Sequence, residues 1–460
     1  MRINDIDNVE LDLSCGQKKA VRDIKKGEKV IKYGEIIGHA TCDVKKGELV
    51  HMHNLESDID FDVEFTCKAE GEVRKSFSPL TFQGYIRADG RVGVRNEVWI
   101  IPTVGCVNPL AQKLARETGA KALCHPWGCS QVGENLERTG AILASLARHP
   151  NAAGVLVLGL GCENNTLASM KERLKDTDPE RVRFLNAQDC ENEYDTAYKI
   201  LLQLFEIAKK DKREPCDFSK LKIGLKCGGS DAYSGICANR LVGLVSEKIY
   251  EKGGTCLMCE IPETFGGEHL LLKRAVNESI LEKAKNIMKR FRGYYKKYGE
   301  GVADNPSPGN HEGGITTLEE KSLGCIQKGG TLPLVNVLEM SERAPDISGL
   351  QLIDGPGNDL ISSTNLTASG AQIILFTTGR GTLFSSPAPT LKIASNAPLA
   401  KKKPHWIDFD SSPCLESDDG FDKEADKLFD LILKTANGEK TRAEENGYYD
   451  ISLFFDGAIL

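Results

Sequence analysis

The sequence predicts a mixed α/β protein, with a small β-rich N-terminal domain followed by two α/β domains. Its 460 residues exceed what one ordinary hydrophobic core accommodates, so two or three domains are expected. Short β-branched runs separated by glycines fill the first segment, which is typical of a small β module. After Gly84, apolar runs alternate with amphipathic stretches, as in a parallel sheet with crossover helices. We place the domains at residues 1–78, 79–215 and 216–460.

Composition and charge narrow the class of protein. The 40% hydrophobic and 27% charged residues are typical of a globular chain. A net charge of -7 argues against a large phosphate-binding surface, so nucleic acid is not an expected partner. No stretch approaches the roughly 20 apolar residues of a membrane span, and the first residues lack a leader pattern, so we expect a cytoplasmic protein without membrane contact. Fifteen cysteines in that compartment favour metal or catalytic roles over disulfides.

Glycines and short apolar runs define the N-terminal domain. Lys25-Lys26-Gly27-Glu28 and Lys45-Lys46-Gly47-Glu48 look alike, and each is predicted to be a turn that leads into a strand. They form a weak internal repeat. Residues 61–78 are charged and poor in large apolar side chains, so we interpret them as a connector.

The two larger domains are predicted from alternating periodicities. In the central domain we expect strands at 97–102, 120–125 and 154–159, and helices at 109–118 and 194–210. Residues 212–220 are polar and contain Pro215, which favours a domain boundary there. In the C-terminal domain we expect strands at 221–225, 255–258, 351–353 and 372–377, and helices at 239–252 and 269–298. Thr317-Leu318-Glu319-Glu320 fits a capping box that starts a further short helix.

Three Gly-Cys pairs follow predicted strands of the central domain, at Cys106, Cys129 and Cys162. Strand ends of an open α/β sheet meet at the ligand crevice, so three such cysteines could converge on one point. A glycine before each one permits a sharp turn. Three thiolates could hold one iron ion, or an iron–sulfur cluster with an open corner. The alternative is that they are small buried hydrophobic residues at tight turns.

Three histidines are further candidates. His51 and His53 lie in an alternating run, which would place both imidazoles on one side of a strand, a suitable arrangement for iron(II). An exposed polar strand edge would give the same pattern. His125, four residues before Cys129, is a candidate ligand or base, and a packed core histidine is the alternative.

Glycine-rich polar segments suggest binding of a hydroxylated anion. Asp89 to Asn96 is a turn that carries Arg91 and Arg95, whose guanidinium groups bind carboxylates in bidentate fashion, although a solvated turn would look the same. Four later loops mix glycine with small polar residues, and none matches a nucleotide-binding motif. They are typical of a site for a polyol. The candidate substrate-binding residues are Arg91, Arg95, Asn96, Ser230, Asp231, Asn310 and Arg380.

Long strings along nearly the whole chain resemble the altronate and galactarate dehydratase family. The strings include Val30-Ile31-Lys32-Tyr33-Gly34, His51-Met52-His53-Asn54, Gly84-Tyr85-Ile86-Arg87, Asp89 to Asn96, Pro102-Thr103-Val104-Gly105-Cys106, Gly228-Gly229-Ser230-Asp231, residues 305–310, Thr316 to Lys321 and Thr377-Thr378-Gly379-Arg380-Gly381. The resemblance implies an N-terminal SAF-like domain before two Rossmann-like α/β domains. It also implies dehydration of a hexonate or hexarate to a 2-keto-3-deoxy acid, with dependence on iron(II). A related branch eliminates sulfite from sulfolactate.

These observations lead to a mechanistic hypothesis. A proton next to a carboxylate is weakly acidic, so its removal requires a cation or fixed donors that stabilise the enediolate. We expect iron(II), or a labile iron–sulfur cluster, with Mn²⁺ as a substitute, held by some of Cys106, Cys129, Cys162, His51 and His53. Arg91 and Arg95 would orient the acid, His125 would act as base or acid, and Lys392 is a second candidate base. We expect altronate as the substrate and a homodimer. The alternatives are a sulfolactate lyase and a non-catalytic sugar-acid-binding or redox iron protein.

Overall fold

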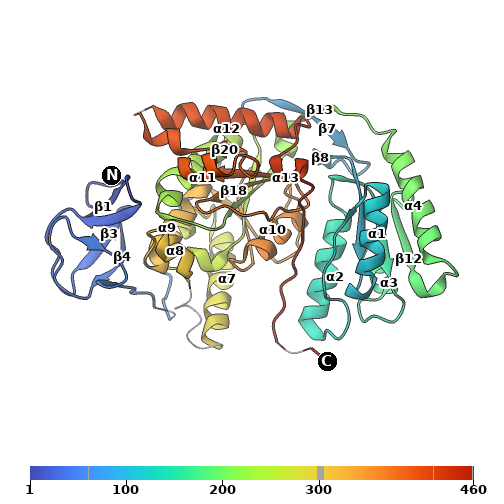
Figure 1. The fold of residues 1–460 in the computed structure, drawn as a ribbon, viewed down its shortest axis with the longest axis horizontal. Helices are drawn as coiled ribbons and strands as arrows, with labels where there is room; N and C mark the ends of the chain where they lie inside the picture. Colours follow the sequence, from blue (N-terminus) through green and yellow to red (C-terminus); the bar gives the residue numbers. More distant parts are fainter. Residues whose placement is uncertain (61, 298–304, 418, 458) are drawn as a thin grey trace.

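The computed structural model describes the chain except for residues 61, 298–304, 418 and 458. Three domains follow one another along the long axis of the molecule (Figure 1). The N-terminal β domain lies at one end and the central α/β domain at the other, with the C-terminal α/β domain between them. The predicted mixed α/β architecture is therefore present. No helix in the described part of the chain is long and apolar enough to cross a membrane.

The N-terminal domain consists of two small antiparallel sheets. One contains β1 (Val9–Asp12), β2 (Gln17–Ala20) and β5 (Leu49–Val50), and the other contains β3 (Lys29–Lys32), β4 (Glu35–Ala40) and β6 (Leu55–Glu56). The two repeated turns pair reciprocally: Asp43 accepts from the Lys26 amide at 3.0 Å, and Asp23 accepts from the Lys46 amide at 2.9 Å. The predicted repeat is thus confirmed as a matched pair of turns.

The connector after this domain forms no helix or strand in its described residues. Its backbone is nevertheless fixed, because the Glu70 amide donates to the Lys273 carbonyl and the Ser78 amide to the Glu251 carbonyl, both at 2.9 Å. The connector therefore runs along the surface of the C-terminal domain. It carries the chain to β7 (Thr81–Ile86).

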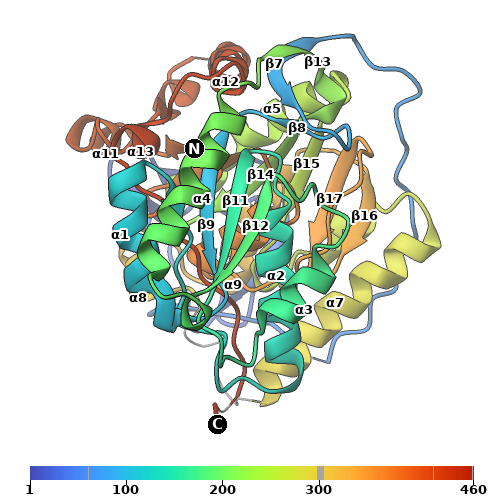
Figure 2. The same ribbon diagram turned by 90° about the vertical axis from the view of Figure 1, so that its right-hand side faces the viewer.

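The central domain contains a four-stranded parallel sheet in the order β10-β9-β11-β12. Its elements are β9 (Glu97–Pro102), α1 (Asn108–Thr118), β10 (Lys121–Ala122), α2 (Gly133–Ala147), β11 (Ala152–Gly159), α3 (Leu167–Arg173), β12 (Val182–Asn186) and α4 (Glu193–Ala208). Helices α1 and α4 cover one face and α2 and α3 the other (Figure 2). Because both faces are covered, β9 and β11 are almost continuously apolar. The predicted strands and helices of this domain are confirmed, except that the strand expected at 120–125 has only two residues.

A small antiparallel sheet joins the central and C-terminal domains. It contains β7, β8 (Val92–Gly93) and β13 (Glu214–Asp217), in the order β13-β7-β8. The polar segment at which a domain boundary was predicted therefore contains a strand, and Pro215 pairs with Gln83. Proline is tolerated there because β13 is an edge strand.

The C-terminal domain contains a parallel sheet in the order β16-β17-β15-β14-β18-β19-β20. The strands are β14 (Lys222–Cys227), β15 (Thr255–Met258), β16 (Leu334–Leu338), β17 (Gly349–Ile353), β18 (Ile373–Thr378), β19 (Thr390–Ala394) and β20 (Phe409–Asp410). The helices are α5 (Asn239–Glu251), α6 (Glu268–Leu272), α7 (Glu278–Lys297), α8 (Pro308–Glu312), α9 (Leu318–Ile326), α10 (Asp359–Ala368), α11 (Ala397–Lys402), α12 (Gly420–Ala436) and α13 (Arg442–Glu445). The strands predicted in this domain are all present.

The single long helix predicted at 269–298 is wrong within the described residues. The segment forms α6 and α7, separated where the Val276 amide donates to the Leu334 carbonyl at 3.2 Å, and Tyr298 lies outside the described part. Asn277 then accepts from the Ile280 amide at 3.0 Å and starts α7. Pairing with the neighbouring chain thus interrupts a segment whose composition alone favours one helix.

Candidate functional site

The C-terminal sheet reverses its winding direction between β14 and β18. From β14 the chain adds β15, β16 and β17 on one side, and it then returns to place β18 on the other side. Ligands of open α/β sheets bind outside the carboxyl ends of the strands at such a switch point. Two of the predicted polar loops begin there, because Gly228 follows β14 and Gly379 follows β18. The amides of Gly379 and Arg380 donate to the Gly229 carbonyl at 3.1 and 3.0 Å, which joins the two loops.

Asp231 fixes the geometry of this crevice. Its buried carboxylate accepts hydrogen bonds from Ser395 Oγ and Asn396 Nδ2, both at 2.8 Å. Burial raises the pKa of Asp231, and these hydrogen bonds oppose the shift. A Cβ atom at Gly379 would lie 2.2 Å from Asp231 Cγ, so only glycine permits this close approach.

A third loop and α8 complete the same crevice. Asn310 Nδ2 donates to the Ser230 carbonyl at 2.9 Å, and Arg380 Nη1 donates to the Gly309 carbonyl at 3.2 Å. The Arg380 guanidinium is half-exposed and forms an ion pair with the exposed Glu312 at 3.1 Å. Four of the residues predicted to bind substrate therefore lie together: Ser230, Asp231, Asn310 and Arg380.

A chain of buried charges lies beside these loops, and it was missed in the sequence. Lys226, Glu260 and Lys328 are at most 1% exposed. Glu260 forms ion pairs with Lys226 and, at 2.8 Å, with Lys328. Lys226 also lies 3.0 Å from the carboxylate of Asp359, which is part-exposed at the first residue of α10. The chain of charges therefore leads from the protein interior to the crevice.

The charge states of Lys226, Glu260 and Lys328 follow from their mutual attraction. Burial would lower the pKa of Lys226, but the carboxylates of Glu260 and Asp359 outweigh it and raise that pKa well above its usual range. Burial would raise the pKa of Glu260, and the two ammonium groups of Lys226 and Lys328 instead lower it. All three groups are therefore charged at neutral pH. Shifted groups of this kind cluster at functional sites.

Backbone geometry marks the same region. Glu260 has φ +78°, a left-handed conformation that is uncommon for any residue other than glycine. Residues Ser234–Ala238, directly after the β14 loop, form one turn of π-helix. Both features are found preferentially at functional sites, where surrounding structure holds an unfavourable conformation. A lysine near the carboxyl end of an otherwise apolar strand, as Lys226 is in β14, was the signal in the sequence that could have identified this site.

Two buried thiols lie beside the crevice loops and the buried charges. Cys227 Sγ lies 2.8 Å from Ser230 Oγ, and Lys328 Nζ lies 2.9 Å from Cys325 Sγ. Burial raises the pKa of Cys325, against the effect of Lys328. Its thiol is therefore uncharged at neutral pH, and it donates or accepts weak hydrogen bonds only.

The N-terminal domain docks directly beside the crevice. Lys18 and Lys32 reach out of their sheets to Glu320 of α9 at 2.8 and 2.5 Å, and all three side chains are buried. Thr317 caps α9 as predicted, because its hydroxyl accepts from the Glu320 amide at 3.3 Å. The Glu320 carboxylate, however, accepts from the Thr316 amide and hydroxyl and from the two lysines, so it does not close a capping box on Thr317.

The predicted strand placement of His51 and His53 is wrong. Strand β5 ends at Val50, and Asn54 closes a turn by accepting from the His51 amide at 2.8 Å. The imidazole of His51 points toward α8 and bonds the His311 carbonyl at 3.0 Å, whereas His53 is exposed. Burial lowers the pKa of His51. Only His51 of this pair therefore approaches the crevice.

The three Gly-Cys pairs do meet at one edge of the central sheet. Cys106, Cys129 and Cys162 follow β9, β10 and β11, and all three are exposed. Their loops touch, because the Gly105 amide donates to the Trp127 carbonyl and the Asn165 amide to the Gly128 carbonyl, both at 2.9 Å. Among the described residues, no three His, Cys, Asp or Glu side chains are spaced to hold a metal ion. The loops converge as expected, but their thiols are not assembled as a ligand set.

The two predicted bases have different environments. His125 is 2% exposed; its Nε2 bonds the Pro102 carbonyl at 2.9 Å and its Nδ1 accepts from the Trp127 amide at 3.2 Å. Burial lowers its pKa to about 4, so the ring is neutral and both nitrogens are occupied. Lys392 Nζ donates to the Thr382 carbonyl at 2.7 Å, in the loop after β18. Burial lowers the pKa of Lys392 to about 8.

The predicted arginine turn lies away from both sets of loops. Arg95 and Asn96 precede β9, whereas Cys106 follows it, and a six-residue strand spans about 20 Å. Arg95 is buried and forms a bidentate ion pair with Glu444 at 2.6 and 2.9 Å. Asn96 bonds Arg87 and the Ala208 carbonyl, each at 2.8 Å. Arg95 and Asn96 therefore bind groups of the protein itself. The predicted cysteines, imidazoles and arginines do not form one site.

Comparison with known protein families shows which family the chain belongs to. The chain matches the profile of the D-galactarate/altronate dehydratase C-terminal domain over residues 218–459. Residues 84–209 match the second domain of D-galactarate dehydratase/altronate hydrolase, and residues 2–58 match the altronate/galactarate dehydratase SAF domain. The chain belongs to the altronate and galactarate dehydratase family. The first profile covers the entire switch-point crevice, and the N-terminal β domain is the SAF domain of this family.

Individual proteins that are similar to this chain include altronate dehydratases of two organisms. The chain is 44% identical to altronate dehydratase of Bacillus subtilis over 464 aligned residues, which cover 98% of this chain and 93% of the relative. It is 41% identical to altronate dehydratase of Escherichia coli, with coverage of 98% and 93%. It is 33% identical to the beta subunit of (2R)-sulfolactate sulfo-lyase of Chromohalobacter salexigens, over 81% of this chain and 97% of that one. Like the two altronate dehydratases, the chain is thus a dehydratase-family protein along nearly its whole length.

Proposed function

We propose that this protein is a hydro-lyase that dehydrates altronate to a 2-keto-3-deoxy acid in the switch-point crevice. The observation that carries the proposal is the convergence of three polar glycine loops and a chain of buried charges at the carboxyl ends of β14 and β18. Two altronate dehydratases that share 41–44% identity with the chain over nearly its full length support altronate as the substrate.

The crevice residues suit the binding of a hydroxylated acid. The half-exposed guanidinium of Arg380 can bind the substrate carboxylate in bidentate fashion. Asn310 and Ser230, fixed by their mutual hydrogen bond, present small polar groups to the hydroxyls. Binding energy at these positions would orient the carbon that loses its proton.

Two groups are candidates for proton transfer. Asp359 is part-exposed and lies at the crevice end of the charge chain, where Lys226 holds its carboxylate in place. We assign it the removal of the proton next to the substrate carboxylate, while Lys226 contributes fixed positive charge behind the developing enediolate. The bond from the neighbouring carbon to its hydroxyl then breaks, the protonated Asp359 returns the proton to that hydroxyl so that it leaves as water, and the enol product tautomerises to the 2-keto acid. Lys392, with a pKa of about 8, is the second candidate, because it could exist as a free amine near neutral pH.

Iron(II), a labile iron–sulfur cluster or substituting Mn²⁺ stays a proposal from the sequence. Cys106, Cys129 and Cys162 offer the soft sulfur donors that iron accepts, and they lie on touching loops. The described residues contain no ready ligand set, so no step is assigned to a metal. Metal analysis of protein purified without oxygen, compared with single cysteine-to-serine variants, tests this part. Residence in the cytoplasm and a homodimer are likewise proposals.

The decisive experiment measures 2-keto-3-deoxy product by periodate–thiobarbiturate over a panel of altronate, galactarate and sulfolactate, with sulfite release as the second readout. Altronate should give the fastest turnover. Asp359→Asn should lower kcat by about 10²-fold or more, as expected for a general base. Asp426→Asn, which changes an exposed surface pair with Lys248, is the matched control and should leave kcat unchanged. Sulfite release without keto-deoxy acid would instead establish the lyase of the sulfolactate branch.

A further inference from the structure

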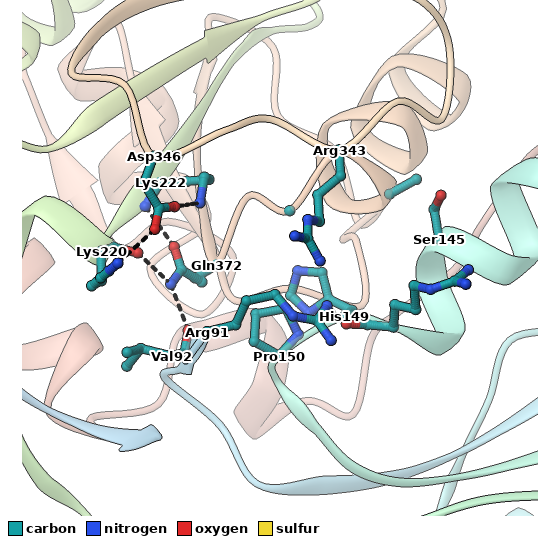
Figure 3. Close-up of a pocket in the computed structure, with 13 residues that line it drawn as sticks. Arg91, Val92, Ser145, His149, Pro150, Lys220, Lys222, Arg343, Asp346 and Gln372 are labelled. Atoms are coloured by element: carbon teal, nitrogen blue, oxygen red, sulfur yellow. Dashed lines mark hydrogen bonds and ion pairs between the residues drawn. The ribbon is translucent and has the colours of Figure 1, made fainter. Parts of the chain in front are cut away.

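A second polar cavity lies between the central and C-terminal domains, at the opposite edge of both sheets from the crevice. Arg91 and Arg148 precede β8 and β11, and Lys222 begins β14, so the cavity is at the amino ends of these strands. Arg343 reaches it from the loop after β16 (Figure 3). A larger cavity of about 340 Å³ adjoins it and shares Arg91, Arg148 and Arg343. We call this shared space the arginine cleft.

Positive charge dominates the arginine cleft. The cavity drawn in Figure 3 is lined by five cationic side chains and one carboxylate, namely Arg91, Arg148, Arg343, Lys220, Lys222 and the carboxylate of Asp346. The carboxylate of Asp346 forms ion pairs with both lysines, with Lys220 Nζ at 2.8 Å. Burial lowers the pKa of Lys222, and nearby Arg343 adds to this effect although Asp346 opposes it. The adjoining cavity adds the cations Arg87 and Arg181 and the carboxylates of Asp89, Asp176 and Asp178, so seven cationic side chains and four carboxylates line the cleft as a whole, and positive charge is in excess.

The three arginines differ in their partners. Arg91 pairs with Asp89 and Arg148 with Asp176, and both carboxylates are at least 45% exposed, so solvent screens these pairs. For Arg343 the described residues provide neither a hydrogen bond nor an ion pair. In Figure 3 its guanidinium points toward Arg91 and His149. Like charges that approach in this way repel one another unless an anion lies between them.

The loop that presents Arg343 is held in a fixed conformation. Ser341 has φ +67°, which is uncommon for a residue with a side chain. Its carbonyl accepts from Ser145 Oγ of α2 at 2.7 Å, across the domain boundary, and the Ala344 amide donates to the Ser369 carbonyl at 3.0 Å. Both sides of Arg343 are therefore anchored, and the left-handed residue is maintained by contacts from another domain.

The floor of the cleft adds no charge. His149 is 3% exposed; its Nε2 bonds the Ala371 carbonyl at 3.0 Å and its Nδ1 accepts from the Asn151 amide at 3.1 Å. Burial, together with the positive charges of Arg91, Arg87 and Lys222, lowers the pKa of His149 to about 3. The imidazole is neutral, so the charge of the cleft comes from its arginines, lysines and aspartates and not from His149.

We propose that the arginine cleft binds a phosphate group, free or carried by a small metabolite, at a site distinct from the substrate crevice. Converging guanidinium groups bind phosphate oxygens through paired, charge-assisted hydrogen bonds, and they match a dianion better than a single carboxylate. Bound phosphate would join Arg343 of the C-terminal domain to Arg91 and Arg148 of the central domain. The ligand would thereby stabilise the docked arrangement of the two domains.

Isothermal titration and thermal unfolding of the full-length protein test this proposal. Inorganic phosphate and a sugar phosphate are compared with acetate, malonate and chloride at matched ionic strength. Either phosphate compound should bind and raise Tm more than chloride. Arg343→Gln should weaken phosphate binding about tenfold or more, because hydrogen bonds to charged groups are lost. Arg116→Gln, which removes an exposed charge from α1, is the control and should bind phosphate like the unchanged protein.

Turnover separates this site from the substrate crevice. If the protein dehydrates altronate, Arg343→Gln should do so at an unchanged rate in phosphate-free buffer. If it does not, phosphate binding and its loss in Arg343→Gln still test the cleft. The proposal is overturned if phosphate acts no more strongly than chloride, or if Arg343→Gln and Arg116→Gln bind it equally. It is also overturned if malonate binds more tightly than phosphate, or if altronate competes with phosphate for the cleft.

Discussion

Glu320→Gln should loosen the SAF domain from the C-terminal domain. The carboxylate is 2% exposed and neutralises Lys18 and Lys32 at 2.8 and 2.5 Å, both of which are buried. Removal of one member of a buried ion pair costs about 3–5 kcal/mol, because a charge is left buried without its partner. Glutamine can still accept from the Thr316 amide, so we expect a loss near 3 kcal/mol.

Denaturant unfolding and limited proteolysis measure this loss. The expected result is a lower midpoint and faster cleavage in the connector, residues 62–78, because its already accessible backbone is less restrained once the SAF domain is undocked. Glu319→Gln is the matched control: among the described residues this neighbouring glutamate accepts from neutral groups only, Ser57 Oγ and the Asp58 amide, so its substitution should cost less stability. Equal midpoints for the two variants would refute the reasoning.

The pH dependence of this contact has a definite sign. The ammonium groups of Lys18 and Lys32 lower the pKa of Glu320 far below its usual value, against the effect of burial. A carboxyl group with a lowered pKa in the folded state contributes its full stability above its unfolded pKa and loses it as the pH falls further. The difference between unchanged protein and Glu320→Gln should therefore be constant from pH 7 to pH 5 and shrink below about pH 4.

Three further results are expected. Lys226→Met should lower kcat about 10²-fold while circular dichroism stays unchanged, because fixed charge behind the enediolate is lost, and a normal kcat would exclude that role. Gly379→Ala should destabilise the fold by about 1–3 kcal/mol through its clash with Asp231, whereas Gly293→Ala, with no atom within 4 Å, should not; thermal unfolding compares them. Acid should destabilise the unchanged protein between pH 6.5 and pH 4, because His125 has a pKa of about 4 in the folded state and the unfolded chain takes up the proton first. The shift is worth about 3 kcal/mol. The free energy of unfolding of His125→Gln should therefore fall less over that pH range than that of the unchanged protein.

Much of the fold could be predicted because its signals are local. The buried strand 97–102 and the helix that begins near Pro109 follow from apolar periodicity, and both are confirmed. The predictions failed where a specific hydrogen bond, from a distant segment or from a nearby side chain, decides the local structure. Val276 pairs with Leu334 and breaks the expected helix, and the side chain of Asn54 closes a turn where alternation suggested a strand. Periodicity contains no information about such contacts.

The candidate site divides in the same way. Glycine loops with small polar residues led to Ser230, Asp231, Asn310 and Arg380, and the structure brings these four residues together. That composition is typical of loops whose backbone approaches a hydroxylated ligand. Arg95 has the residue type of an anion-binding group, yet its guanidinium is buried against Glu444. A residue type defines what a side chain can bind, and only burial and partners define what it does bind.

The sequence by itself indicated the main buried strands of the two α/β domains, the division into three domains, the family resemblance and the polar loops. Only the tertiary structure decided that β14 and β18 are neighbours, and therefore where these loops meet. It also decided that Glu260 joins Lys226 and Lys328, which lie 34 and 68 residues away along the chain. The physical reason is that periodicity reports the side of an element that is buried, whereas the pairing of buried charges depends on the order of strands in the sheet.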